Sequence, residues 1–389
     1  MATKRPRETT RAAIAFDIDG VFKYGREWSK DGSRALQRVT EAGMPFVFVT
    51  NGGGGLTEAA YGGSMTTKIA GASKTKTPVT IGPERMVLSY TPWKTMLAPG
   101  LENGRVLLVG DPREKVLEVA RNYGINSTHY QDYAIENDTI NPFRAAKSGG
   151  TSHTAVAVAS AKPTFSGKEA PHSPRASSSA KGPEEPFVAV LVMCDPYEWY
   201  EAHQAAVDVL CSPTPLTLEY DAHAPPMPVH FSNPDVLWKS EHPFPRFGQG
   251  AFKLALRALY TERLRFLRVP SETIDERVAA FKQWGKPTES TFRFLEERLR
   301  TLAPTPGEVS AERFYMVGDN PTSDIEGARR SNIHHRKEGK TSWQGVLVKT
   351  GVYKDGDETN GAAAVVDGVA EAVDYILDRE AKLNAGQDA

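Results

Sequence analysis

The stretch from Ala12 to Tyr24, AAIAFDIDGVFKY, constrains the fold most, because an apolar run ends abruptly in two aspartates and a glycine. Such a run predicts a buried strand of a parallel α/β sheet. The strand would deliver Asp17 and Asp19 to its carboxyl end, which is the edge where ligands bind in α/β folds. A carboxylate in that position can be a nucleophile or a magnesium ligand. The same residues alone are equally compatible with an acidic turn.

Composition and charge narrow the class of protein. The chain has 389 residues, enough for roughly two or three domains of typical size. Lysine and arginine number 47 against 48 aspartates and glutamates. This formal net charge of -1 gives no electrostatic reason to expect nucleic acid or an anionic membrane as a partner. Any phosphate chemistry must therefore come from a local site.

The cysteines and the first residues bear on the cellular location. Cys194 and Cys211 are too few for a disulfide framework or a cysteine zinc site, which fits a reducing compartment. No apolar stretch approaches the roughly 20 residues of a membrane helix, so we expect no transmembrane segment. The opening MATKRPRETTR is basic and bears hydroxyl groups, like part of a mitochondrial presequence, but it is short for one. We expect a mitochondrial location, with the cytoplasm as the alternative.

A second strand end carries groups suited to phosphate. Residues 45–49 predict a strand parallel to the first, because the helical spacing of residues 29–42 supplies a right-handed crossover. Thr50 and Asn51 follow this strand, and four glycines precede a predicted helix from about Thr57. A hydroxyl, an amide and free backbone N–H groups at a helix N-terminus can bind phosphate. Taken alone, the stretch is also an ordinary glycine-rich loop.

Two further strand ends carry charged residues. Residues 281–284 predict a short strand followed by Lys286 and a helix that begins near Thr288. A single lysine is normally a solvated surface charge. Residues 314–317 predict another short strand, which ends in GDNPTSD before a helix. Asp319 and Asp324 lie five positions apart across that turn, so they can converge on one cation.

A second α/β unit is predicted inside the first, with strands at residues 105–109, 187–193 and 229–231. The segment from Ala145 to Pro186 is rich in Ser, Ala, Lys, Gly and Pro, so we expect a disordered insertion without a catalytic role. The expected order is a flexible tail (1–10), a first core part (11–84), the inserted unit (85–240), a second core part (241–380) and a flexible tail (381–389).

The four strand ends together resemble the haloacid dehalogenase (HAD) superfamily, whose motifs are a DxD pair, a Thr or Ser, a Lys and an acidic GD(x)nD stretch. The resemblance covers nearly the whole chain. TN, GKP and GDNPTSDI are similar to the class IIA forms, which carry an inserted C2 cap. FSNPDVLWKSEHPFPRFGQGAF and WQGVLVKTGVY resemble the HAD-like hydrolase domain-containing 5 subfamily, also called the cat-eye-syndrome critical region protein 5 subfamily. The resemblance implies a Rossmann-like parallel-sheet core with an α/β C2-type cap.

The residue types, read with the resemblance, suggest two catalytic aspartates. Asp17 can attack phosphorus in line and form an aspartyl phosphate. Asp19 lies two residues on, and in an extended chain it would face the same side. There it can protonate the leaving alkoxide and then deprotonate the attacking water. A dehalogenase has no alkoxide to protonate, so Asp19 favours phosphoester hydrolysis, whereas the large cap argues more weakly against a phosphomutase.

The resemblance also implies the groups that hold the metal and the phosphate. Mg²⁺ prefers oxygen ligands. By resemblance these are the Asp17 carboxylate, the Asp19 backbone carbonyl and Asp319. Asp324 would be a direct ligand or would orient the site. The remaining three groups, Thr50, Asn51 and Lys286, would bind the transferred phosphoryl oxygens, and Lys286 would thereby also take part in catalysis.

The leading hypothesis is a Mg²⁺-dependent phosphomonoester phosphatase for a small phosphorylated substrate whose leaving group contacts the cap. Asp195, Tyr197 and Trp199 are candidates for that contact, although ordinary loop and packing roles are more common for such residues. The alternatives are a role in glycerophospholipid metabolism and a non-catalytic HAD-fold scaffold. A homodimer through the cap is a further possibility. His334 and His335, two adjacent histidines in a polar segment, are interpreted as solvated side chains rather than as metal ligands.

Overall fold

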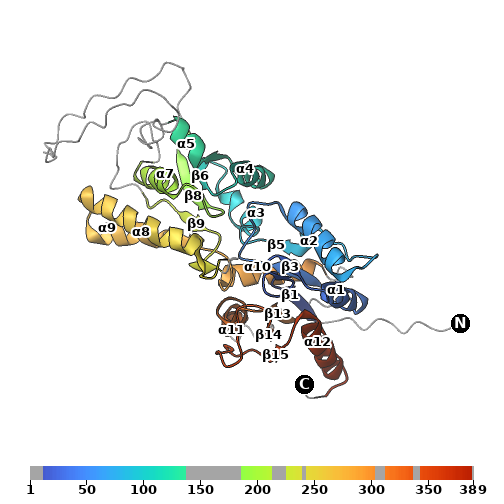
Figure 1. Ribbon diagram of the computed structural model, residues 1–389. Helices are drawn as coiled ribbons and strands as arrows, with labels where there is room; N and C mark the ends of the chain where they lie inside the picture. Colours follow the sequence, from blue (N-terminus) through green and yellow to red (C-terminus); the bar gives the residue numbers. More distant parts are fainter. Residues whose placement is uncertain are drawn as a thin grey trace, which may run out of the picture.

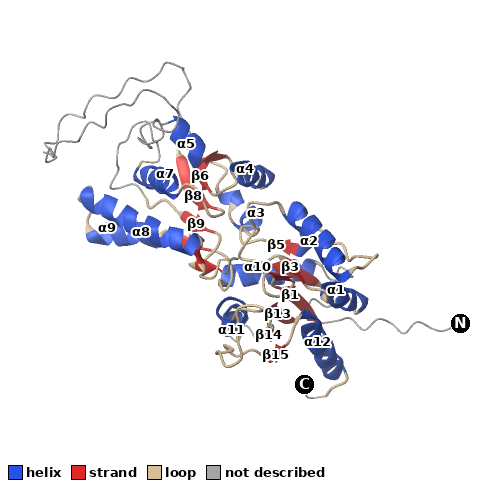
Figure 2. Cartoon of the chain, in the orientation of Figure 1, coloured by secondary structure: helices blue, strands red, loops and turns tan. Residues whose placement is uncertain are grey.

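The computed structural model describes residues 12–136, 185–212, 225–238, 242–302, 312–335 and 342–387. Figures 1 and 2 show two separate groups of strands, each flanked by helices. Every pairing within the two large sheets is parallel. The predicted α/β class with parallel sheets is therefore confirmed. The predicted tail at residues 1–10 lies outside the described residues, as does the predicted insertion except for its last two positions.

The first sheet has six strands in the order β15-β14-β13-β1-β4-β5. Its strands are β1 (Ala12–Phe16), β4 (Phe46–Val49), β5 (Met86–Val87), β13 (Arg313–Gly318), β14 (Ser342–Val348) and β15 (Ala364–Val366). Strand β1 lies between β13 and β4, and all five of its residues are buried. This central place explains why its sequence is a continuous apolar run rather than an alternating one.

Helices cover both faces of the first sheet. Ile14 and Phe16 face a core that includes side chains of α1 (Gly32–Glu41), α2 (Glu58–Ser73) and α12 (Val369–Asn384). Ala13 and Ala15 face the opposite core, which α10 (Glu289–Thr301) and α11 (Glu326–His335) complete. This alternation along β1 is what a period of two residues requires. Helix α12 continues to Asn384, so the first residues of the segment expected to be a flexible tail are helical.

The second sheet has five strands in the order β12-β9-β8-β6-β7. They are β6 (Arg105–Val109), β7 (Ser127–His129), β8 (Phe187–Val192), β9 (Val229–Phe231) and β12 (Phe281–Gln283). Its helices are α4 (Arg113–Asn122), α5 (Tyr130–Glu136), α7 (Trp199–Cys211), α8 (Gln249–Phe266) and α9 (Ser271–Ala279). The predicted strands of the inserted unit are thus present, with β8 ending one residue earlier than expected.

Two short strands belong to a different sheet from the one that the expected domain boundaries imply. Strand β12 pairs with β9, and its Phe281 packs against the second core, whereas residues 241–380 were expected to be one part of the first core. Strand β5 pairs with β4 in the first sheet, although the inserted unit was expected to start at residue 85. Both strands have two or three residues, and so short a run carries no signal for its partner.

Short elements complete the described chain. A small hairpin of β2 (Lys23–Tyr24) and β3 (Glu27–Trp28) follows the first strand end, and a second hairpin of β10 (Leu237–Trp238) and β11 (Arg246–Phe247) precedes α8. The helical turns are η1 (Pro83–Arg85), α3 (Trp93–Met96), η2 (Ala98–Gly100) and a π-helical turn η3 (Pro321–Ile325). Among the described residues, no helix is long and apolar enough to cross a bilayer.

Candidate active site

Three buried carboxylates meet where β1 and β13 end. Asp17 follows β1, and its backbone N–H donates to the Val317 carbonyl of the neighbouring strand at 2.8 Å. Asp319 follows β13, and Asp324 lies in η3 immediately after it. Carboxylate oxygens of Asp17, Asp319 and Asp324 lie within 4.8 Å of one another. They converge because parallel neighbouring strands end at the same edge of a sheet.

Lys286 reaches this cluster from the second sheet. It follows β12, and its side chain is almost completely buried. Its Nζ lies 2.6 Å from Asp17 Oδ1 and 2.7 Å from Asp324 Oδ1. Most single lysines are solvated surface charges, but Lys286 is buried, and its ammonium group bridges two carboxylates.

The charges in this cluster do not balance. Three carboxylates face one ammonium group, and all four side chains are buried. Burial raises the pKa of Asp17 well above its usual value; Lys286 opposes the shift, while Asp324 and Asp319 add to it. Burial and the neighbouring Asp324 raise the pKa of Asp319 to about 6. Burial disfavours the charge of Lys286, but the two carboxylates outweigh it and raise the pKa of the ammonium group. A divalent cation would offset the excess negative charge.

Asn51 holds the backbone at Lys286. The Asn51 Oδ1 accepts from the Lys286 N–H at 2.7 Å, and its Nδ2 donates to the Lys286 carbonyl at 3.0 Å. The same Nδ2 lies 3.2 Å from Asp235 Oδ1. The Asn51 amide was predicted to bind phosphate. In the structure it bonds to the backbone of Lys286 and to Asp235, and so it positions the lysine. Thr50 is buried beside it, and its Oγ1 accepts from the Gly52 N–H at 3.0 Å.

The Asp19 carboxylate is separate from the buried cluster. Its side chain is 57% exposed and lies 2.8 Å from the ammonium group of Lys23 in the β2–β3 hairpin. The chain leaves β1 at Phe16, so the alternation of an extended strand no longer fixes where Asp19 points. Burial is the largest cause that raises the pKa of the Tyr61 phenol, and the nearby charges of Asp19 and Asp17 raise it further.

The loop after β14 completes the site, although none of its residues was among the predicted site residues. The Val352 N–H donates to Asp319 Oδ2 at 2.6 Å, and Thr350 Oγ1 donates to the Gly20 carbonyl at 2.5 Å. A Cβ atom on Gly351 or Gly20 would overlap the Asp319 carboxylate. Glycine is therefore required at both positions. The signal available in the sequence was the Thr-Gly pair at a fifth strand end.

Two carboxylates that follow strands of the second sheet also have raised pKa values. Burial, with a contribution from Asp235, raises the pKa of Asp195 to about 6. Burial also raises the pKa of Asp235, although Lys286 and Asn51 oppose that shift. Tyr197 is largely exposed, whereas Trp199 packs against His203 and Phe252 in the second core. Of the three candidates for contact with a leaving group, Trp199 is thus a packing residue.

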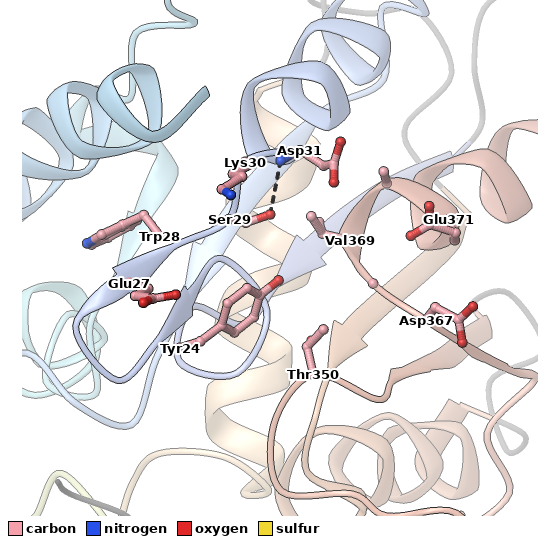
Figure 3. A pocket seen from close by; sticks show the side chains of 12 residues that line it. Tyr24, Glu27, Trp28, Ser29, Lys30, Asp31, Thr350, Asp367, Val369 and Glu371 are labelled. Atoms are coloured by element: carbon pink, nitrogen blue, oxygen red, sulfur yellow. Dashed lines mark hydrogen bonds between the residues drawn. The ribbon is translucent and has the colours of Figure 1, made fainter. Parts of the chain in front are cut away.

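A hollow of about 350 Å³ lies between the β2–β3 hairpin and the start of α12 (Figure 3). The buried cluster does not line it. Four carboxylates and one lysine lie around it, a balance that disfavours a phosphate group. These charged residues are Glu27, Lys30, Asp31, Asp367 and Glu371. The hollow therefore shares Thr350 with the loop after β14 but contains none of the buried carboxylates or Lys286.

His230 should make the stability of the folded protein depend on pH. It is buried on β9, and its Nδ1 accepts from Trp284 Nε1 at 3.0 Å. Burial, with a smaller effect of Lys282, lowers the pKa of His230 to about 4. The unfolded chain takes up the proton near pH 6.5. The folded protein should therefore lose up to about 3 kcal/mol of stability as the pH falls from 6.5 to 4.

The variant His230→Asn keeps an acceptor near Trp284 but cannot be protonated. Urea unfolding at pH 7.5 and pH 5 should show a smaller loss of free energy of unfolding in the variant than in the wild type. Equal losses in the two proteins would show that His230 does not carry this dependence. The comparison between the two proteins cancels the titration of other buried groups.

Comparisons with known proteins agree with this arrangement. The family model described as haloacid dehalogenase-like hydrolase matches residues 14–126, and the HAD-hydrolase-like model matches residues 283–372. A mitochondrial hydrolase of Saccharomyces cerevisiae is 30% identical, over 98% of this chain and 100% of its own length. A cardiolipin synthase (CMP-forming)/mitochondrial hydrolase fusion protein of Schizosaccharomyces pombe is 26% identical. That match covers 98% of this chain, which spans 56% of the relative's length.

Solved structures share the fold. The p-nitrophenyl phosphatase of Archaeoglobus fulgidus has a TM-score of 0.55 at 14% identity, covering 95% of this chain and 100% of its own. A glycerol phosphate phosphatase of Mycobacterium tuberculosis, in complex with magnesium, has a TM-score of 0.53 at 15% identity. That match covers 94% of this chain and 77% of the other. The expected family is confirmed, and the chain belongs to the haloacid dehalogenase-like hydrolases.

Proposed function

We propose that the protein is a Mg²⁺-dependent phosphomonoester phosphatase that acts on a small phosphorylated metabolite through an aspartyl phosphate on Asp17. The observation that carries the proposal is the buried Asp17 carboxylate, held 2.6 Å from Lys286 Nζ beside two further carboxylates. A nucleophile fixed in this way is oriented before the substrate arrives. The phosphatases among the structural neighbours are compatible with this chemistry.

The residues present fit a magnesium ion. Asp17, Asp319 and Asp324 offer oxygen ligands only, as Mg²⁺ prefers, and their charge exceeds that of Lys286. These three carboxylates would hold the ion, with the Asp19 backbone carbonyl as the further ligand expected from the family. When bound, the metal would offset the negative charge that develops on the transferred phosphoryl group.

The chain's own groups account for both halves of the reaction. In the first half, an Asp17 oxygen attacks phosphorus and the ester P–O bond breaks. The carboxyl group of Asp19, which has to turn from Lys23 towards the buried cluster, gives its proton to the leaving alkoxide. In the second half, Asp19 takes a proton from water, whose oxygen attacks the phosphorus and releases inorganic phosphate and the Asp17 carboxylate. Lys286 orients Asp17, and Asn51 fixes the backbone that carries Lys286.

One substrate class has specific support. A relative joins the hydrolase to a cardiolipin synthase, and a structural neighbour acts on glycerol phosphate. A glycerol phosphate from glycerophospholipid metabolism is therefore the second candidate substrate. The relative named as a mitochondrial hydrolase supports a mitochondrial location for this chain.

The decisive experiment is phosphate release from a panel of phosphomonoesters that includes glycerol phosphates. We expect turnover with Mg²⁺ and loss of turnover with a chelator, restored by added Mg²⁺. The variant Asp275→Asn, which changes an exposed carboxylate on α9, should behave like the wild type. No release from any substrate would favour the scaffold hypothesis, and release that survives chelation would contradict the metal assignment.

A further inference from the structure

Exposed apolar side chains concentrate on one part of the described chain. Eight of the 13 large hydrophobic residues with exposed side chains fall between Val236 and Phe266. They belong to the β10–β11 hairpin and to α8, which follows it directly. We call the described residues 236–238 and 242–268 the hairpin–α8 surface. So dense a group of exposed apolar side chains is unusual for a protein surface that faces only water.

The hairpin carries its aromatic rings outward. Leu237 pairs with Phe247 and Trp238 with Arg246, and both two-residue strands are exposed. The exposed fractions are 51% for Trp238, 71% for Phe244 and 66% for Phe247. None of these rings belongs to a hydrophobic core cluster of the described chain. Such rings favour an apolar environment over water.

Helix α8 has two apolar sides. One side, with Phe252, Leu256 and Tyr260, packs into the second core. On the other side, Leu254, Leu259 and Phe266 are exposed by half or more. At 100° per residue these three fall within one arc of about 140°. Only Gly248 separates β11 from α8, so the exposed apolar side chains of the hairpin and of the helix are close neighbours along the chain.

The same surface is basic. From Arg246 to Arg268 the chain has six lysines and arginines and one acidic residue, Glu262, which leaves an excess of five positive charges. Asp208 pairs with Arg263 and Glu262 with Arg265. Lys253 turns to the second sheet, where its Nζ donates to Gln283 Oε1 at 2.9 Å. The remaining positive charges of the surface are therefore those of Arg246, Arg257 and Arg268. The formal net charge of -1 for the whole chain conceals this local excess. The net charge of the whole chain therefore does not exclude an anionic membrane as a partner of this surface.

We propose that the hairpin–α8 surface docks on an anionic phospholipid membrane, with the hairpin rings at headgroup depth and α8 lying along the surface. Aromatic rings favour the interface between lipid and water, and a helix with apolar and basic side chains lies within it. Each basic side chain near an anionic leaflet adds to the electrostatic attraction. A second copy of this chain is a poorer partner, because a two-fold interface would bring two like-charged surfaces together.

Docking would place the candidate active site beside the membrane. The hairpin begins directly after Asp235, whose carboxylate contacts Asn51 in the site. The attachment would be peripheral and reversible, since it involves side chains at the lipid–water interface rather than a helix that spans the bilayer. This inference concerns binding alone and does not depend on the proposed phosphatase activity.

Vesicle flotation tests the proposal. The full chain should bind vesicles of phosphatidylcholine mixed with phosphatidylglycerol much more strongly than vesicles of phosphatidylcholine alone, and added salt should weaken this binding. The double variant Trp238→Ala/Phe247→Ala should bind about tenfold or more weakly, because two interfacial rings are lost. Arg257→Gln/Arg268→Gln should reduce binding to the anionic vesicles selectively. Ile333→Ala, which alters an exposed apolar residue on α11, should bind like the wild type.

The same experiment can overturn the proposal. Wild-type protein that does not float with anionic vesicles, or variants that float equally well, would show that this surface does not bind lipid. A wild-type dimer that the hairpin variant converts to a monomer would assign the surface to self-association instead. Sedimentation analysis of each protein without vesicles distinguishes this outcome. Unchanged urea unfolding of the variants shows that a loss of binding is not a loss of fold.

Discussion

The variant Asp17→Asn should lose phosphate release by at least about 10⁴-fold, while the protein remains folded. An amide cannot supply the carboxylate oxygen that attacks phosphorus, so the covalent route is closed. In the wild type, Lys286 Nζ lies 2.6 Å from Asp17 Oδ1. The amide oxygen of the variant can still accept a hydrogen bond from it. The geometry of the site should therefore survive the change.

Stability gives a second readout for Asp17. Burial raises the pKa of this group, so the folded protein holds the proton more tightly than the unfolded chain does. Its ionisation therefore costs stability as the pH rises above the unfolded value of about 3.9. Without divalent metal at pH 8, Asp17→Asn should be at least as stable as the wild type. With Mg²⁺ the order should reverse, because a ligand that binds only the folded state stabilises it.

Phosphate release and thermal unfolding, each with Mg²⁺ and with a chelator, test both expectations. Asp275→Asn should leave all four measurements unchanged, since this carboxylate is exposed on α9. Activity that persists in Asp17→Asn would refute its role as nucleophile. A full stabilising effect of Mg²⁺ in that variant would instead show that Asp17 is not a metal ligand.

The edge of the first sheet could be predicted from the sequence, because β1, β4 and β13 can each be recognised from a local apolar run. The apolar runs before Asp17, Thr50 and Asp319 predict buried parallel strands, and parallel strands place their carboxyl ends together. The buried acidic pair after β13 follows from the same reasoning. Local pattern is sufficient here because the chain order of strand, helix and strand restricts the topology.

Other features depend on contacts between distant segments, and a local pattern does not contain them. The amide of Asn51 bonds to the backbone of Lys286, 235 positions away, and so positions the lysine, whereas the sequence predicted only that Asn51 binds phosphate. The three residues of β12 join the second sheet because β9 is their neighbour in space. The direction of Asp19 depends on how the chain turns after β1 and on Lys23. The need for glycine at position 351 follows only from the place of the Asp319 carboxylate.

The variant Lys286→Met should destabilise the protein by about 3–5 kcal/mol and abolish turnover, because it removes the one cation between two buried carboxylates. Methionine has an unbranched stem of similar length, so the loss is mainly electrostatic. Asp17 and Asp324, whose oxygens lie 2.6 Å and 2.7 Å from Nζ, would be left without this partner. Urea unfolding in the presence of a chelator measures the cost.

Two comparisons separate the electrostatic cost from a packing defect. The double variant Lys286→Met/Asp324→Asn removes one of the stranded charges, so it should recover part of the lost stability. Mg²⁺ should also stabilise Lys286→Met more than it stabilises the wild type, because the divalent ion then replaces the missing positive charge. If the double variant is no more stable than the single one and Mg²⁺ has no larger effect, the cost lies in packing. The carboxylate cluster would then not depend on Lys286 for its charge balance.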